Sequence, residues 1–503
     1  MTSTKWLRRT LLGGVALTVM ASSGAQADEL ADLKAQLEAL QSRVNTLEQQ
    51  PAQQASNIPP GASFITFERG SRMDFVIQDR VSDRINQNDD AGFTIAITPT
   101  ADMPAPVAEI VIYGYVKGDV IYDLDGTFNK FSFSMPGQDR FDEDDDEYVF
   151  LHANQSRFGI KSKVDTAIGQ IRSRIEVDFL AASEADDFGD AFLGLGQQNT
   201  VRLRQAHGEW DMTPNWTLGV GQADQLATLT TIGVTLVDFF GDAGINGGAR
   251  FAQVRLTYKD GPLTWAVGIE RPEEASDTLI PAVGSFLIYD IPGGHQINIA
   301  GTINDIDTHR RIEEEFIEED DDHQLGWVVG AGMNINLADI ATFTGGAQYT
   351  EGLATRWMNQ LDTTRDVCEF EDGDFGGVVD ECDGLQKAFG VTAGLTYNVN
   401  DTTSINVEGG YAKNIDAEDN DLLVVDNVWT VHGNILWQPV KQMRLGWEVM
   451  WGRENFIDEK FDLVNGEEER VCRVFEVDED GDIDDNCDSS DALRFQFGAW
   501  FFF

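Results

Sequence analysis

The sequence has no uninterrupted apolar run as long as the roughly 18 residues that a membrane-spanning helix requires, although 42% of its 503 residues are hydrophobic. This absence excludes helical membrane spans. If the chain crosses a bilayer, it must cross as β-strands. Its length exceeds the usual size of a single globular core, so we expect either several domains or one large repetitive sheet.

Basic residues are also scarce, with 36 Lys and Arg against 86 Asp and Glu, which gives a formal net charge of −50. A nucleic-acid partner is excluded because it would need a basic surface. No serine or cysteine nucleophile stands in a recognisable motif, and the histidines are scattered along the chain at positions 152, 207, 295, 309, 323 and 432. We therefore expect neither an enzyme nor a resident cofactor.

Residues 1–27 have the three parts of a cleavable signal peptide. A basic start with Lys5, Arg8 and Arg9 precedes an apolar run, and small residues follow at positions 25–27. The alternative, a membrane anchor, would need about twice this apolar length. We expect export, with Asp28 as the first mature residue.

Only four cysteines are present, and they form two close pairs. In an exported chain this spacing predicts two local disulfides, one joining Cys368 to Cys382 and one joining Cys472 to Cys487. A zinc site is the alternative. The spacings are not those of zinc ligands, however, and no histidine accompanies them.

Residues 28–50 carry an apolar seam whose members are alternately three and four residues apart: Leu30, Leu33, Leu37, Leu40, Val44 and Leu47. Three such heptads favour a coiled coil over an isolated amphipathic helix, and the spacing does not fix the number of chains. Residues 51–109 are predicted to form a Pro-containing linker followed by an extended periplasmic neck.

From residue 110 to 503 polar and apolar residues alternate strictly, as in strands with one apolar face. Sixteen segments show this pattern, and an even number is what a closed bacterial barrel requires. They lie at 110–124, 149–164, 168–183, 200–212, 215–226, 249–259, 262–272, 282–290, 295–306, 323–338, 341–355, 385–400, 403–415, 427–438, 441–455 and 490–503. The expected fold class is all-β, a 16-stranded antiparallel transmembrane barrel with an N-terminal α-helical coiled coil.

The connections between these segments alternate between tight turns and long loops. A sandwich or a propeller gives no reason for this alternation, whereas a barrel with periplasmic turns and extracellular loops does. An even strand number places the neck and Phe503 on the same, periplasmic side. A final strand that ends in Phe also resembles the recognition signal of the barrel-assembly machinery.

Several stretches together resemble the DcaP-like outer-membrane porins: GYVKGDVIYDL (114–124), QSRFGIKSKV (155–164), IRSRIEVDFL (171–180), VRLRQAHGEW (201–210) and GGARFAQVRLTY (247–258). The resemblance covers most of the mature chain and is densest between residues 110 and 272, whereas the C-terminal half and the acidic loops match less clearly. It implies a homotrimer. The apolar strand faces predict contact with the lipid bilayer of the Gram-negative outer membrane, and the acidic loops are expected to meet lipopolysaccharide. The resemblance also implies passive diffusion of small anions such as dicarboxylates.

Alternation alone assigns a basic wall to the inward face. Strands two to four and six contribute its members: Arg157, Lys161, Arg172, Arg174, Arg202, Arg204 and Arg255. Arginine is a permanently charged, fork-shaped donor, so such a wall favours anions. The alternative is that Glu176, Asp178 or Glu209 neutralises it.

The sequence leaves three further functions open. A phosphate-selective O/P-type porin is one of them, although inward lysines would then be expected where this chain has mostly arginines. A non-conducting surface-structural or adhesin barrel is the second. An outer-membrane lipase is the third, and it lacks support from any catalytic motif.

Loop 227–248 is more apolar and less acidic than the other long loops, as expected of a segment that folds back into the barrel. In that position Asp238 and Asp242 would oppose the arginines across a constriction. An ordinary surface loop is the alternative.

The other long loops are strongly acidic, and Asp478, Asp480, Asp482 and Asp484 alternate as oxygen ligands do in calcium-binding loops. The stretch departs from the EF-hand pattern, because Ile483 replaces the invariant glycine and the twelfth position lacks glutamate. Specific Ca²⁺ binding, diffuse Mg²⁺ or Ca²⁺ association and simple solvation therefore all stay open.

Acidic loops repel the anions that a basic wall attracts, within a screening length of about 8–10 Å. Divalent ions that neutralise the loops and bridge them to lipopolysaccharide would remove this conflict. We expect chelation of divalent ions to change conductance or ion selectivity in planar bilayers. If chelation leaves both unchanged, the loops do not act through bound cations.

Overall fold

A computed structural model describes the part of the chain that bears on the fold. The described residues are 64–70, 73–77, 91–98, 108–124, 147–181, 200–238, 242–245, 250–272, 280–307, 311–313, 316–318, 323–338, 340–359, 361, 363–364, 366–370, 379–420, 423, 425–457, 460–464, 467–471, 476–477, 483–484 and 489–503. The signal peptide, the coiled coil, Cys472, Cys487, Asp478, Asp480 and Asp482 lie outside these residues, so the predictions made for them stay predictions.

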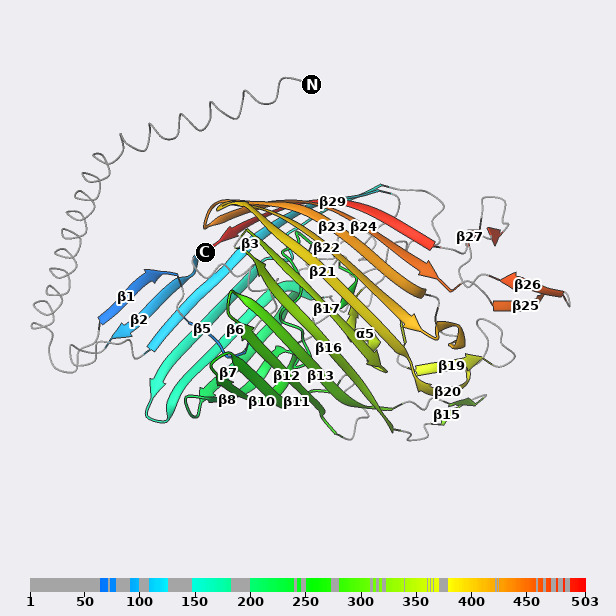
Figure 1. Cartoon of the computed structure of the whole chain (residues 1–503), viewed down its shortest axis with the longest axis horizontal. Helices are drawn as coiled ribbons and strands as arrows, with labels where there is room; N and C mark the ends of the chain where they lie inside the picture. Colours follow the sequence, from blue (N-terminus) through cyan, green and yellow to red (C-terminus); the bar gives the residue numbers. More distant parts are fainter. Residues whose placement is uncertain are drawn as a thin grey trace, which may run out of the picture. The chain divides into compact units, whose positions relative to one another are not determined.

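Sixteen strands of the described chain close into one antiparallel barrel (Figure 1). They are β3 (Ala108–Leu124), the interrupted strand β4 (Tyr148–His152) with β5 (Arg157–Thr166), β6 (Gly169–Ala181), β7 (Thr200–Asp211), β8 (Trp216–Asp224), β10 (Arg250–Asp260), β11 (Leu263–Glu270), β12 (Ala282–Ile291), β13 (His295–Asp307), β16 (His323–Leu337), β17 (Ala341–Glu351), β21 (Lys387–Asn400), β22 (Thr403–Ile415), β23 (Val425–Val440), β24 (Met443–Phe456) and β29 (Ser489–Phe502). Each overlaps one of the sixteen predicted segments, so the predicted barrel is confirmed.

Shorter elements accompany the barrel. β1 (Phe64–Arg69) and β2 (Phe93–Thr98) join the same sheet through β3. The others are β9 (Gly244–Ile245), β14 (Arg311–Glu313), β15 (Phe316–Glu318), α5 (Ala354–Trp357), β18 (Met358–Asn359), β19 (Asp366–Phe370), β20 (Val379–Leu385), η3 (Ala417–Asp419), β25 (Lys460–Val464), β26 (Glu467–Val471), β27 (Glu476–Val477) and β28 (Ile483–Asp484). Among the described residues, no helix is long and apolar enough to span a membrane.

The barrel closes where its last strand meets its first. β29 pairs with β3 from Leu493 opposite Leu124 to Phe502 opposite Tyr115. Beyond this ladder, Phe503 and Gly114 exchange backbone hydrogen bonds of 3.1 and 3.2 Å. The C-terminal residue therefore completes the ring, and no barrel strand of the described chain is left with an open edge.

The second strand of the ring is interrupted, whereas the sequence predicted one continuous strand over 149–164. β4 and β5 both pair with β3, with His152 opposite Asp119 and Arg157 opposite Tyr115. A turn separates them, in which the Ser156 amide donates to the Ala153 carbonyl at 3.0 Å. The turn directs Asn154 and Gln155 into buried positions.

The two faces of the barrel differ in polarity, as the alternation predicted. Large apolar side chains such as Val254, Ile299, Val329 and Trp447 are exposed on the outward face. Charged and amide side chains are buried on the inward face. Exposed apolar area of this extent is costly in water and is stable in hydrocarbon, so the outer surface is suited to a bilayer.

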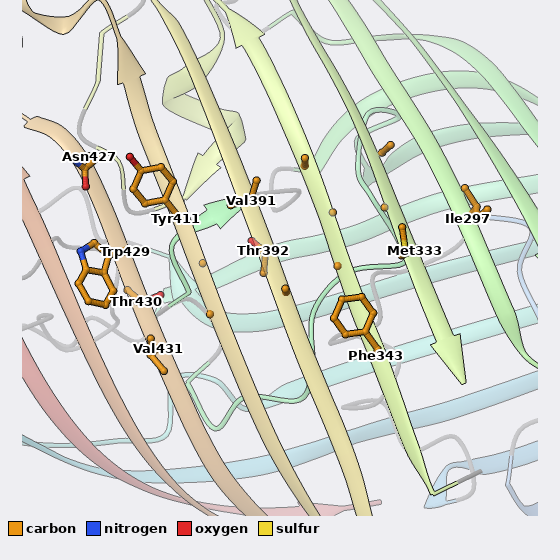
Figure 2. A pocket seen from close by; sticks show the side chains of 18 residues that line it. Ile297, Met333, Phe343, Val391, Thr392, Tyr411, Asn427, Trp429, Thr430 and Val431 are labelled. Atoms are coloured by element: carbon orange, nitrogen blue, oxygen red, sulfur yellow. The ribbon is translucent and has the colours of Figure 1, made fainter. Parts of the chain in front are cut away.

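One part of the outward face is hollowed into a groove of about 840 Å³ across β16, β17, β21, β22 and β23 (Figure 2). Small residues, among them Ala331, Ala347 and Ala393, line it. Phe343 and Trp429 stand along it. The lining is almost entirely apolar. Because the groove lies on the face suited to lipid, it is not part of a water-filled path.

The antiparallel pairing of β19 and β20 places Cys368 directly opposite Cys382. A disulfide between facing positions of neighbouring strands satisfies the usual distance requirement between the two α-carbons. The predicted bond itself stays a prediction. Asp484, in β28, pairs with Glu476 of β27. Among the described residues, no group of three or more His, Cys, Asp and Glu is arranged to hold a metal ion.

The closure point yields a testable prediction. Gly114 has a φ of +158°, and a Cβ there would lie 2.3 Å from the Arg157 carbonyl oxygen, which belongs to the paired backbone. We expect Gly114→Ala to lower the free energy of unfolding by about 2–3 kcal/mol. Thermal loss of the strand circular dichroism signal in detergent measures it.

Gly118 on the same strand provides the matched control, because a Cβ there would meet nothing within 4 Å. Gly118→Ala should change the stability by no more than about 0.5 kcal/mol. Equal effects of the two substitutions would show that close approach at Gly114 does not limit closure.

Candidate functional site in the barrel interior

The predicted basic wall lies on the inward face of β5, β6, β7 and β10. Arg174, Arg204 and Arg157 are each about 2% exposed, and Arg202 is the most open at 30% of its side chain. Lys161, Arg172 and Arg255 are buried as well. The structure thus places all seven predicted residues inward.

The centre of this wall is a network of ion pairs around two carboxylates. Glu176 lies 2.8 Å from Arg174 and 2.9 Å from Arg204, and its Oε1 is 3.6 Å from Arg157. Asp178 binds Arg202 at 2.6 Å and Arg204 at 3.1 Å. Each carboxylate therefore bridges neighbouring strands through guanidinium groups, which fixes the orientation of the arginines.

A second part of the wall lies closer to the tight turns. Arg172 binds Glu209 at 2.9 Å and Asp211 at 2.7 Å. Lys161 lies over the ring of Tyr113, with its Nζ 4.7 Å from the ring centroid. The Tyr113 hydroxyl donates to Glu176 at 2.7 Å and accepts from Arg174 at 2.9 Å, so it links the two parts of the wall.

A β-bulge explains why both Arg204 and Gln205 are buried on the inward face. The register between β6 and β7 shifts there, so that Gln205 pairs with Glu176 whereas Leu203 pairs with Val177. One residue is added on β7, and the alternation changes its phase. Arg202 and Arg204 thus point inward at even positions, while His207 and Glu209 do so at odd positions.

The wall is paired, but its charges do not cancel. On β5–β7 the paired group holds six basic residues and four carboxylates: Arg157, Lys161, Arg172, Arg174, Arg202 and Arg204 against Glu176, Asp178, Glu209 and Asp211. The carboxylates therefore neutralise part of the positive charge of the wall, as the alternative interpretation of the sequence expected. The group retains a formal excess of two positive charges.

The loop that the sequence predicted to fold inward does so. Leu226, Leu229, Val234 and Val237 are all 2% exposed or less. From the end of β8 the loop follows the inner wall past β11, β13 and β22 to β24. This path excludes the alternative of a surface loop for the described residues 225–238 and 242–245.

Carboxylates and amides of the wall hold the backbone of this loop. The Leu226 amide donates to Glu270 and the Thr230 amide to Asn298. Further along, the Val234 amide donates to Glu408 at 2.8 Å and the Val237 amide to Glu448 at 2.7 Å. The wall thus supplies the hydrogen bonds that a buried irregular backbone needs.

Glycines in the wall make room for the loop. A Cβ at Gly446 or Gly498 would lie 2.6 or 2.8 Å from Val237, and a Cβ at Gly394 would lie 2.5 Å from Val234. Glycine also occupies other inward positions that face the loop, among them Gly284, Gly330, Gly332, Gly346 and Gly410. The loop consequently lies flat against the strands.

The loop returns along the wall and meets a second inward segment. The Ala243 amide donates to Thr430 at 2.8 Å, and β9 pairs with β18 through Met358 opposite Ile245. Helix α5 precedes β18, and its Trp357 is 1% exposed. The beginning of the acidic loop 356–384 therefore folds into the barrel, which the sequence analysis did not predict.

Asp238 and Asp242 take different positions from those expected. Asp238 binds Arg494 of β29 at 2.9 Å, and Arg494 also binds Asp123 of β3 at 2.7 Å. Asp242 interacts electrostatically with Glu408 and His432 of β22 and β23. Asp238 is thus paired with β29, and electrostatic neighbours of Asp242 lie on β22 and β23, whereas the paired arginines of the wall lie on β5–β7.

A polar hollow of about 260 Å³ lies on the side of the interior formed by β21–β24. Amides, hydroxyls and the Asp401 carboxylate line it together with Arg444 and with Thr235 of the inward loop. Arg444 donates to Gln438 at 3.2 Å and lies over the ring of Phe502. This hollow offers hydrogen-bond donors and one guanidinium to a hydrophilic solute.

The sequence analysis missed most of the residues that position the loop. Glu270, Glu408, Glu448 and Asn298 stand at inward positions, where they read as ordinary polar lining. Glycine at inward positions of β16, β21 and β24 was a usable signal that chain packs against the inner wall. A strand that only lines a polar pore gives no reason for a missing side chain at these positions.

Glu448 provides a test of how the loop is held, because it accepts from the Val237 and Asp238 amides and also contacts His432 and Asn434. We expect Glu448→Ala to destabilise this part of the loop by about 3 kcal/mol. Amide hydrogen exchange at Val237 and Asp238 should then be about 100-fold faster. Glu448→Gln keeps one acceptor oxygen and should accelerate amide exchange less than Glu448→Ala does. Equal exchange rates at Val237 and Asp238 in the two variants would refute the anchoring role.

No protein-family model matches the chain, and no curated protein matches it. Among solved structures, the outer membrane channel DcaP of Acinetobacter baumannii is similar, with a TM-score of 0.58, 18% identity and coverage of 79% of this chain and 97% of that chain. In-vitro folded OmpT, an outer membrane protein of Vibrio cholerae, has a TM-score of 0.48, 11% identity and coverage of 79% and 98%. An anion-selective porin from Comamonas acidovorans has a TM-score of 0.46, 12% identity and coverage of 78% and 100%. The described chain thus has the barrel fold of the DcaP channel, the fold that its sequence resemblance to DcaP-like porins implied.

Proposed function

We propose that the protein is an outer-membrane porin through which small hydrophilic solutes, preferentially small anions such as dicarboxylates, diffuse passively. The observation that carries this proposal is the distribution of charge in a closed barrel. The outward face is apolar, and the inward face of β5–β7 holds an excess of positive charge. Diffusion through such a channel needs no cofactor and no covalent chemistry.

The composition of the wall supports carboxylates as the preferred solutes. Five of its six basic residues on β5–β7 are arginines, whose planar guanidinium groups match a carboxylate with two parallel hydrogen bonds. Arg202, at 30% side-chain exposure, and Arg444 in the polar hollow are placed to meet a solute. A phosphate-selective O/P-type porin stays the second candidate within transport, and the predominance of arginine over lysine argues against it.

A non-conducting adhesin or surface-structural barrel is the alternative outside transport. It accounts for the apolar exterior but gives no reason for an inward loop held at many points around the interior. Ion conductance in a planar bilayer separates the two functions.

The assembly belongs to the same proposal. We infer a homotrimer in the Gram-negative outer membrane, with residues 28–50 forming a coiled coil in the periplasm and the acidic loops contacting lipopolysaccharide, with or without bound Ca²⁺ or Mg²⁺. Phe503 lies at the tight-turn end, beside Gly114 near the start of β3. This position supports recognition of the last strand by the barrel-assembly machinery and a periplasmic location of both ends of the barrel.

Replacement of Arg172 and Arg174 together tests the anion preference. The double variant Arg172→Ala, Arg174→Ala removes the formal excess of two positive charges from the wall. We expect its anion-over-cation permeability ratio to fall at least about fivefold, which corresponds to about 1 kcal/mol. The reversal potential under a salt gradient in planar bilayers measures this ratio.

Lys259→Ala is the matched control, because Lys259 is exposed at the end of β10, outside the wall. It should leave the reversal potential unchanged. An unchanged anion preference in the double arginine variant, in protein that still folds, would exclude the wall as the selectivity site.

A further inference from the structure

Five residues that precede the barrel in sequence, Met73–Ile77, lie against its inward face. They contact β3, β7 and β8 near the tight-turn end. Met73 and Ile77 are 2% and 4% exposed, so this lumenal segment is packed and not merely close to the wall. The sequence had assigned these residues to an extended neck.

The wall holds the segment through its backbone. Glu209 of β7 accepts from the Val76 amide at 2.9 Å and from the Ile77 amide at 2.6 Å, using one carboxylate oxygen for each. The same carboxylate binds Arg172 at 2.9 Å and is 1% exposed. Two consecutive amides on one buried carboxylate form a charge-assisted anchor that is independent of side-chain identity.

The wall also provides apolar contacts that match the side chains of the segment. Met73 packs with Val111 and Tyr113, and Phe75 packs against the same cluster. The Phe75 ring meets His207 edge to face, with centroids 5.5 Å apart. Ile77 fills the space that Gly219 leaves open, since a Cβ there would lie 3.3 Å from its Cδ1.

We propose that the lumen wall around Glu209, His207 and Tyr113 is a binding site for a segment of this same chain, Met73–Ile77, which closes the tight-turn side of the pore when bound. The bound segment covers Tyr113, whose ring and hydroxyl contact Lys161 and Arg174. Release of the segment exposes this part of the basic wall to the lumen. The inference rests on the proposed function, because it presumes a conducting pore.

Substitutions at Ile77 test the anchor without altering the wall. Ile77→Pro removes one of the two amides that donate to Glu209, whereas Ile77→Ala keeps both amides and shortens only the side chain. We expect single-channel conductance in planar bilayers to rise at least twofold in Ile77→Pro, with a smaller rise in Ile77→Ala. If Ile77→Pro conducts no better than the wild type, the proposal is overturned.

A cross-link tests occupancy directly and does not depend on how the proline variant folds. In the double variant Phe75→Cys, His207→Cys, a short bifunctional thiol reagent should join the two positions, because the native rings are in contact, and mass spectrometry of the digested protein should detect the linked peptides. The single variants control for exchange with the four native cysteines. Absence of the cross-link in folded protein would overturn the proposal.

The same recordings separate this inference from the proposed selectivity. The effect of the segment is measured as a ratio of conductances, and anion preference as a reversal potential. A wild-type pore without anion preference would contradict the proposed solute class, while the rise in Ile77→Pro would still support closure by the segment.

Discussion

The fold depends on one constraint, that a backbone amide or carbonyl surrounded by hydrocarbon must find its partner within the protein. An open sheet cannot meet this requirement, because its edges stay unpaired. The ring meets it by joining β29 to β3, and the final contact comes from the last residue of the chain, Phe503, on Gly114. Once the ring is closed, the outward side chains are free to be apolar and the inward ones to be polar.

The same requirement operates inside the barrel, where irregular chain is buried. The long inward loop and the lumenal segment Met73–Ile77 have no strand partners along most of their described length, and several of their amides donate to side chains of the wall instead, carboxylates among them. Glu270, Glu408, Glu448 and Glu209 each accept from such an amide. Acidic residues on the inner face are thus structural anchors, while arginines of the opposite sign are oriented by Glu176 and Asp178.

Alternation of side chains was sufficient to predict the sixteen strands and the facing of Arg157, Arg172 and Arg174, because period two is imposed by the geometry of each strand alone. It could not predict the bulge at Arg204 or the turn between β4 and β5, since both change the phase within an apparently regular pattern. It also could not locate the backbone amides that donate to Glu209 or Glu448, which lie more than 130 and 200 residues away in sequence. Apart from glycines at inward positions of the wall, contacts between the wall and the chain inside it leave no periodic trace.

The anchoring of the inward loop through main-chain amides has a consequence for how such a pore can diversify. Carboxylates that accept from the backbone make no demand on the hydrogen-bonding chemistry of the side chain on the residue they hold. The course of the loop is thereby uncoupled from the hydrogen-bonding chemistry of its less buried positions, of which the described residues include Gly233 and Asp242. Evolution or an engineer could exchange those positions to retune permeation while the scaffold that supports them is left untouched.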